Sequence, residues 1–159
     1  MKRTIILLLV GSAIGLFVFS FLSPTRSDQR KESYRVIRVF DGDTIEIEGG
    51  KRIRYIGIDT PEIKNDKGAV ECFAQQARDK NRELVEGKMV TLLKDVSETD
   101  DYGRLLRYVF IEDIFVNEVL VNEGYAKSTP IAPDIAYRNQ LFESQKTAQT
   151  RKRGLWISC

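Results

Sequence analysis

The stretch YRVIRVFDGDTIEIEGGKRIRYIGI, residues 34–58, decides the fold. Apolar residues alternate or cluster over three strand-length runs, at 34–40, 44–48 and 51–58. The tripeptide DGD and the pair GG separate these runs, and both are typical of tight turns. The stretch therefore predicts three consecutive strands, for which a meander is the simplest topology.

The remainder of the chain supplies two more strands and three helices. Residues 69–88 have apolar residues at helical spacing, although Asn81 interrupts the stripe, and Gly87 is a suitable end. Runs at 89–93 and 105–111 predict strands, and helices are expected at 116–124 and 133–154. Five strands with a helix between the third and fourth is the order of the OB-fold. We therefore predict a mixed α+β domain over residues 34–159, with a five-stranded barrel and three helices.

The first 22 residues look like an export segment. Lys2 and Arg3 precede an uncharged, mostly apolar run over residues 4–22, which is typical of a signal peptide or a membrane anchor. The polar residues 23–33 are then a linker. We expect an extracellular protein, either secreted or anchored at the outer face of the membrane. Without Lys2 and Arg3 the chain has as many acidic as basic residues, so phosphate binding would need a local basic cluster.

The residue types that the chain lacks also restrict its chemistry. It has no histidine, which excludes histidine acid–base catalysis and a serine–histidine triad. Its two cysteines, Cys72 and Cys159, cannot by themselves make a zinc site. In an oxidising compartment they would either form one disulfide or remain as two unlinked thiols.

Three carboxylates stand at the edges of predicted strands. Asp43 ends the DGD turn, and Asp59 and Glu62 lie in IDTPE, where proline ends a strand. Each has a simple explanation in local hydrogen bonding at a turn. In a small barrel, however, all three can share one rim, and such hard oxygen ligands suit Ca²⁺ or Mg²⁺.

Arginines near these carboxylates could bind a phosphate. Arg54 precedes Asp59 on the same predicted strand, but residues five apart point to opposite faces of a regular strand. A bulge at Gly57 would allow them to converge. Alternatively, Arg54 covers apolar surface with its stem. Arg104, which follows a turn, is a second possible phosphate ligand, and from composition alone Arg107 is an equal alternative.

Five motifs, in order, resemble the thermonuclease (staphylococcal nuclease) family: DGDT, IRYIGIDTPE, DDYGR, VNEVLVNEGYA and RGLW. The resemblance covers nearly all of residues 34–158. It implies an OB-fold enzyme that depends on Ca²⁺ and cleaves DNA and RNA to give 3′-phosphate ends. Position by position, it implies calcium ligands, a glutamate that activates water, and two phosphate-binding arginines. The implied calcium ligands are Asp43, Asp59 and the carbonyl of Thr60. Glu62 is the implied glutamate, and Arg54 and Arg104 are the implied arginines.

The sequence departs from the family pattern where the substrate would bind. Pro130 and Ala132 stand where tyrosines pack on the nucleotide, and Asp101 replaces a lysine that contacts phosphate. Weaker stacking and weaker ionic affinity are therefore expected. We expect a monomer that prefers single-stranded DNA and RNA. Two alternatives are a non-catalytic OB-fold module that only binds nucleic acid, and a two-metal Mg²⁺ nuclease on another fold.

Overall fold

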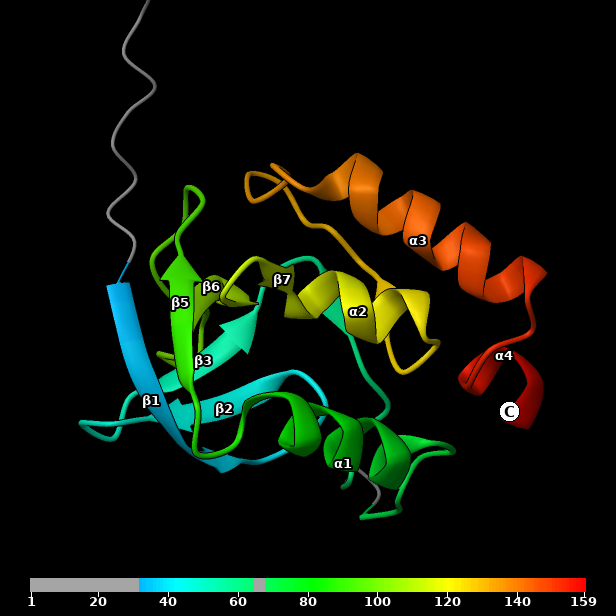
Figure 1. Cartoon of the computed structure of the whole chain (residues 1–159), viewed down its shortest axis with the longest axis horizontal. Coiled ribbons are helices and arrows are strands. Elements are labelled where there is room, and N and C mark those ends of the chain that lie inside the picture. Colours follow the sequence, from blue (N-terminus) through cyan, green and yellow to red (C-terminus); the bar gives the residue numbers. More distant parts are fainter. Residues whose placement is uncertain (1–31, 65–67) are drawn as a thin grey trace, which may run out of the picture.

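The computed structural model describes residues 32–64 and 68–159, and five of its strands close into a barrel (Figure 1). These strands are β1 (Glu32–Val39), β2 (Thr44–Ile47), β3 (Arg52–Tyr55), β5 (Met89–Leu93) and β6 (Leu105–Ile111). Their order is β3-β2-β1-β5-β6, and a parallel pairing of β3 with β6 closes the barrel. The first three strands form the expected antiparallel meander. The predicted five-stranded OB-type barrel is confirmed.

Three short strands modify the predicted pattern. They are β4 (Ile58–Asp59), β7 (Ile114–Phe115) and β8 (Lys127–Ser128). The prediction of one strand over residues 51–58 was wrong, because a turn at residues 56–57 divides it into β3 and β4. The strand β4 leaves the barrel and pairs with β8 instead. At the other end, β1 begins at Glu32, so the strand includes two residues of the predicted linker.

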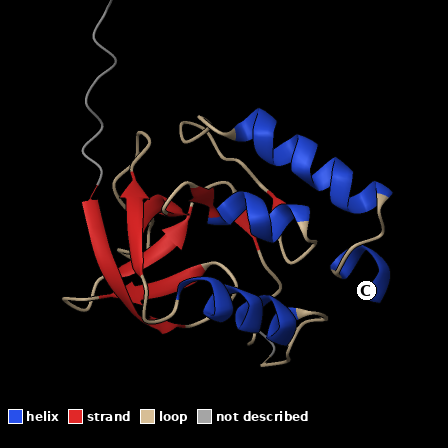
Figure 2. Ribbon diagram, viewed as in Figure 1, coloured by secondary structure: helices blue, strands red, loops and turns tan. Residues whose placement is uncertain are grey.

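The described residues form four helices where three were predicted (Figure 2). They are α1 (Ala74–Val85), α2 (Val116–Asn122), α3 (Arg138–Thr150) and the short α4 (Leu155–Ser158). The first helix starts five residues later than expected, because Phe73 adopts a left-handed conformation with φ of 71°. The extra helix begins with the last two residues of the RGLW motif. Helix α2 packs against both α1 and α3, so the helices form one layer beside the barrel.

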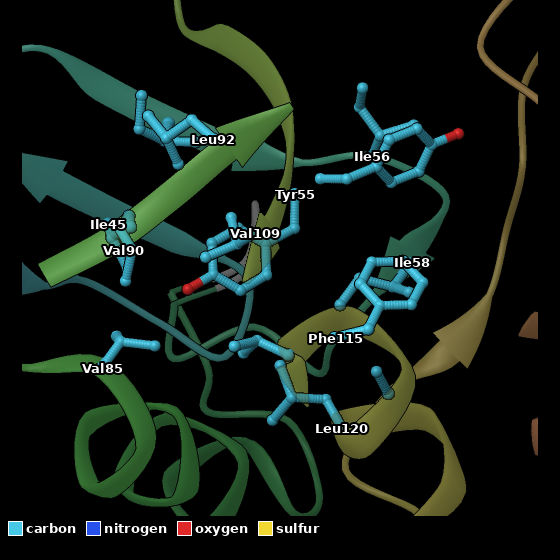
Figure 3. Close-up of a cluster of buried hydrophobic side chains, with 14 of the residues drawn as sticks. Ile45, Tyr55, Ile56, Ile58, Val85, Val90, Leu92, Val109, Phe115 and Leu120 are labelled. Atoms are coloured by element: carbon cyan, nitrogen blue, oxygen red, sulfur yellow. The ribbon is translucent and has the colours of Figure 1, made fainter. Parts of the chain in front are cut away.

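The core fills the barrel and continues beneath the helices (Figure 3). Ile45, Val90 and Val109 contribute from the strands, and Val85 and Leu120 contribute from helices α1 and α2. All five side chains are fully buried. This shared core holds α1 and α2 in fixed positions relative to the strands, since burial of apolar side chains supplies most of the stability of such a fold.

Asn81, which interrupts the apolar stripe of α1, has a definite place in this core. Its side chain is fully buried. The Asn81 Oδ1 atom accepts a hydrogen bond from the Tyr55 hydroxyl at 3.0 Å, and its Nδ2 donates to the Asp41 carbonyl at 3.1 Å. This polar residue therefore links α1 both to β3 and to the turn between β1 and β2.

A disulfide joins Cys72 to Cys159, with a Cα–Cα distance of 5.9 Å. It fixes the last residue of the chain to the segment before α1. The predicted signal or anchor at residues 1–22, and all but the end of the predicted linker, lie outside the described residues. Within residues 32–64 and 68–159, no helix has the length and apolar character needed to cross a membrane.

Candidate active site

The corner between β3 and β4 brings Arg54 and Asp59 together. Arg54 Nη2 donates to Asp59 Oδ1 at 2.9 Å, and Nη1 donates to the Ile58 carbonyl at 2.9 Å. Gly57 makes the turn between the strands with φ of 77°, and a Cβ atom there would lie 2.8 Å from Leu141 Cδ1. The expected irregularity at Gly57 is therefore present, and it removes the difficulty that strand parity posed.

Asp43 lies deep beneath this corner. Its Oδ2 forms an ion pair with Arg54 Nη1 at 2.8 Å and accepts the Thr60 backbone N–H at 2.8 Å. Gly42 allows the turn to approach closely, since a Cβ atom there would lie 2.6 Å from Thr60 Cγ2. Burial raises the pKa of the Asp43 carboxyl to about 7, against the lowering effect of the Arg54 guanidinium. One arginine thus bridges two carboxylates, of which Asp43 comes from the turn before β2 and Asp59 from β4.

The donor set at this corner suits a hard cation. The carboxylates of Asp43 and Asp59 and the backbone carbonyl of Thr60 are oxygen donors of the kind that Ca²⁺ prefers. The shared contact with one guanidinium shows that both carboxylates can face a single positive charge. Among the described residues, no three His, Cys, Asp or Glu side chains gather closely enough to hold a metal ion by themselves. A metal here would thus rely on two carboxylates, one carbonyl and water.

Glu62 lies just beyond this corner, on the wall of a cavity of about 990 Å³ that Arg104 also lines. Burial raises the pKa of the Glu62 carboxyl, and the nearby Asp41 carboxylate raises it further. The position of the Glu62 backbone is fixed by Glu71. The Glu62 N–H donates to Glu71 Oε2 at 3.0 Å, and the Glu71 N–H donates to the Glu62 carbonyl at 3.0 Å.

The two arginines that composition could not separate have different surroundings. Arg104 is half-buried; its Nε donates to Asp100 Oδ2 at 2.7 Å, and its Nη1 lies 3.4 Å from Thr44 Oγ1. Arg107 is buried within β6, where it forms an ion pair with Glu98 and donates to the Leu106 carbonyl. Arg107 is therefore occupied by structural contacts, while Arg104 faces the cavity.

Several residues that the sequence did not single out support the site. Asp41 accepts the N–H of Asp43 at 3.1 Å, Glu71 fixes Glu62, and Asp100 holds Arg104. The DGD spacing could have indicated Asp41, because an aspartate at a turn often bonds to the backbone two residues later. Glu71 gave no local signal, since its contact spans nine residues.

A second cavity, of about 430 Å³, borders both Arg54 and Arg104. Asp101 and Ala132, two of the unusual positions noted in the sequence, line it. The neighbouring Ile131 is exposed. The lining also includes Asp100 and Asp134, so this cavity combines three carboxylates and the two arginines with aromatic, aliphatic and small side chains.

The five-stranded barrel with its layer of helices defines an OB-fold protein, and the contacts of Arg54 with Asp43 and Asp59 mark its candidate site. Residues 52–158 match the family model described as "Staphylococcal nuclease homologue". The chain therefore belongs to the staphylococcal nuclease family.

Its relatives are similar over most of their length. The chain is 33% identical over 165 residues to the thermonuclease of Staphylococcus hyicus, and the match covers 98% of each chain. It is 33% identical over 164 residues to the thermonuclease of Staphylococcus intermedius, again with 98% of each chain covered. It is 34% identical over 140 residues to endonuclease YncB of Bacillus subtilis, covering 84% of this chain and 66% of that protein.

Proposed function

We propose that this protein is an exported, Ca²⁺-dependent endonuclease that hydrolyses the phosphodiester bonds of DNA and RNA to leave 3′-phosphate ends. The observation that carries the proposal is the convergence of Arg54, Asp43 and Asp59 beside a cavity that Arg104 and Glu62 line. The family relationship supports a nuclease, because relatives over nearly the whole chain are named thermonucleases.

In this proposal, Asp43, Asp59 and the carbonyl of Thr60 would hold the calcium ion. Calcium bound there would supply positive charge that offsets the negative charge of the phosphate under attack. Arg54 and Arg104 would bind non-bridging phosphate oxygens through their guanidinium groups. For this, Arg54 must exchange at least one of its present carboxylate bonds for a phosphate oxygen.

Glu62 would orient the attacking water and accept its proton. The water oxygen would form a new bond to phosphorus while the bond from phosphorus to the 5′ oxygen breaks. The departing 5′ oxygen would take a proton from solvent. The products would be a 3′-phosphate and a 5′-hydroxyl. Glu71 would position Glu62 rather than react, because its carboxylate accepts the Glu62 N–H and its own N–H donates to the Glu62 carbonyl.

Digestion of single-stranded DNA tests the proposal. The purified protein should cut with Ca²⁺, stop when a chelator is added, and lose orders of magnitude in rate in Glu62→Gln. The matched control is Glu143→Gln, which changes an exposed carboxylate on α3 and should leave the rate unaltered. Product ends that resist phosphatase, or full activity in Glu62→Gln, would refute the assigned chemistry.

The second possibility is a module that binds nucleic acid without cutting it, since OB-fold barrels commonly bind oligonucleotides. Retained binding without hydrolysis, under every metal condition, would favour this alternative.

Export, a membrane tether at residues 4–22 and a monomeric state belong to the same proposal as the nuclease activity. Cell fractionation and gel filtration of the purified protein would test them.

A further inference from the structure

A row of charged residues crosses the outer surface of the barrel toward Arg104. Arg38 lies opposite Glu46 in the β1–β2 pairing, and Glu46 lies opposite Arg52 in the β2–β3 pairing. Because Ile53 pairs with Leu105 in parallel register, the preceding residues Arg52 and Arg104 are also neighbours. The register alone therefore places Arg52 between Glu46, on the outer surface of the sheet, and Arg104, at the proposed active site.

Two of these arginines are held in place by one aromatic ring. The Cζ atoms of Arg38 and Arg52 lie 4.7 Å and 4.6 Å from the centroid of the Phe40 ring. Both arginine side chains are exposed, and neither forms an ion pair within residues 32–64 and 68–159. We call these residues the Arg38–Phe40–Arg52 stack. Stacking on the ring orders both guanidinium groups and leaves their N–H donors available.

The stack leads directly into the cavity of the proposed active site. Lys51 and Arg52 line the same cavity, of about 990 Å³, as Glu62 and Arg104. Along β3, Arg52 and Arg54 point to the same face and lie about 7 Å apart, at roughly 3.3 Å per residue. Successive phosphates along a nucleic-acid strand have a comparable spacing. A strand with one phosphate at Arg54 could therefore place a further phosphate near Arg52.

We propose that the Arg38–Phe40–Arg52 stack, together with Lys51, is an extended phosphate-binding subsite for the substrate strand beyond the bond that is cut. This inference rests on the proposed function, because it assumes that the cleaved phosphate lies between Arg54 and Arg104. The described domain has no overall excess of basic residues. The subsite would therefore supply a local basic surface for the polyanionic substrate. The subsite is specific for nucleic acid longer than a dinucleotide, because a dinucleotide has no second phosphate to reach the stack.

The test compares Arg38→Gln/Arg52→Gln in the full-length protein with a control that removes the same charge. The control is Lys146→Gln/Arg151→Gln, whose exposed side chains belong to the α3 region, away from the β2–β3 hairpin (Figure 1). Binding of a long single-stranded oligonucleotide is measured by fluorescence anisotropy in chelator, at several salt concentrations. Hydrolysis of the same oligonucleotide and of a dinucleotide is measured with Ca²⁺. Lys51→Gln, in a loop, serves as a variant that leaves the strands untouched.

For the stack variant we expect the slope of log affinity against log salt to flatten by about 1.4, at about 0.7 for each lost contact. The same relation gives roughly 25-fold weaker binding at about 0.1 M salt. The slope for Lys51→Gln should flatten by about 0.7. Hydrolysis of the dinucleotide should be unchanged in all variants, and the control should behave like wild type.

An unchanged salt slope in both the stack variant and Lys51→Gln would overturn the proposal. An equal loss of hydrolysis on the dinucleotide and the oligonucleotide would also overturn it, because the arginines would then be acting on the catalytic centre or the fold. If the wild-type protein cuts neither substrate, the proposed function fails. The anisotropy slopes would still decide whether the subsite binds phosphate.

Discussion

Replacing Asn81 by alanine should destabilise the fold and disturb the proposed active site together. The substitution removes two hydrogen bonds and leaves the Tyr55 hydroxyl and the Asp41 carbonyl without their partner. Tyr55 is only 1% exposed, so water cannot replace the lost contact to its hydroxyl. The unsatisfied buried hydroxyl of Tyr55 costs about 1 to 3 kcal/mol, and the loss of the half-buried bond to the Asp41 carbonyl adds about 0.5 to 1.5 kcal/mol, which gives a total of about 1.5 to 4.5 kcal/mol.

Urea unfolding followed by circular dichroism measures this loss. With a slope of about 2 kcal/mol per molar urea, a loss of about 3 kcal/mol lowers the midpoint by about 1.5 M. The control, Asn139→Ala, changes an exposed asparagine of α3 and should shift the free energy of unfolding by less than about 0.5 kcal/mol. Asn81→Ala should also slow hydrolysis, because the turn that leads to Asp43 loses its anchor to α1.

A double-mutant cycle tests the reasoning itself. In Tyr55→Phe the hydroxyl is already absent, so Asn81→Ala should cost about 1 to 3 kcal/mol less in that background than in wild type. Equal costs in the two backgrounds would show that the Tyr55–Asn81 hydrogen bond contributes nothing. A midpoint within experimental error of wild type for Asn81→Ala would reject the whole account of this buried link.

Three further predictions separate catalytic from structural contacts. Arg104→Gln should lower the rate of hydrolysis by orders of magnitude with little change in the free energy of unfolding. Arg107→Gln should lower the free energy of unfolding by about 1 to 3 kcal/mol and keep the activity of the folded fraction. The reverse pattern would exchange their roles. Reduction of Cys72–Cys159 should add the mass of two hydrogen atoms and lower stability by about 4.6 kcal/mol, since the bridge spans 87 residues; no mass gain would exclude the bridge. Burial favours the neutral carboxyl of Asp134, but the backbone N–H groups of Ser97 and Val96 donate to its carboxylate and lower its pKa, so its ionised form stabilises the fold above the unfolded pKa. The deficit of Asp134→Asn seen at neutral pH in urea melts should therefore shrink as pH falls through the folded pKa, and a deficit independent of pH would contradict this.

The strands of the barrel were predictable because their signals are local. Alternating apolar residues and turn residues within 34–58 determine where strands run and where they end, whatever surrounds them. The same holds for β5 and β6, whose predicted bounds match the structure. The break of 51–58 into β3 and β4 was only partly anticipated, because a glycine in a strand pattern suggests a bulge but is also compatible with a continuous strand. The local pattern did not show the close approach of Leu141 on α3, whose Cδ1 would lie 2.8 Å from a Cβ atom at Gly57.

The sequence by itself determined the five strands of the barrel, the family resemblance and the identity of the residues proposed for chemistry. Only the tertiary structure decided how those residues meet. It brought Arg54 between Asp43 and Asp59, it placed the buried Arg107 in an ion pair with Glu98 and Arg104 on a cavity, and it joined Glu71 to Glu62. The reason is physical: residue type and local spacing specify the backbone conformation and the chemical properties of each side chain. Convergence depends on the corner between β3 and β4, which joins Arg54 to Asp59, and on the closure of the barrel, which brings Arg104 from a segment about 50 residues away.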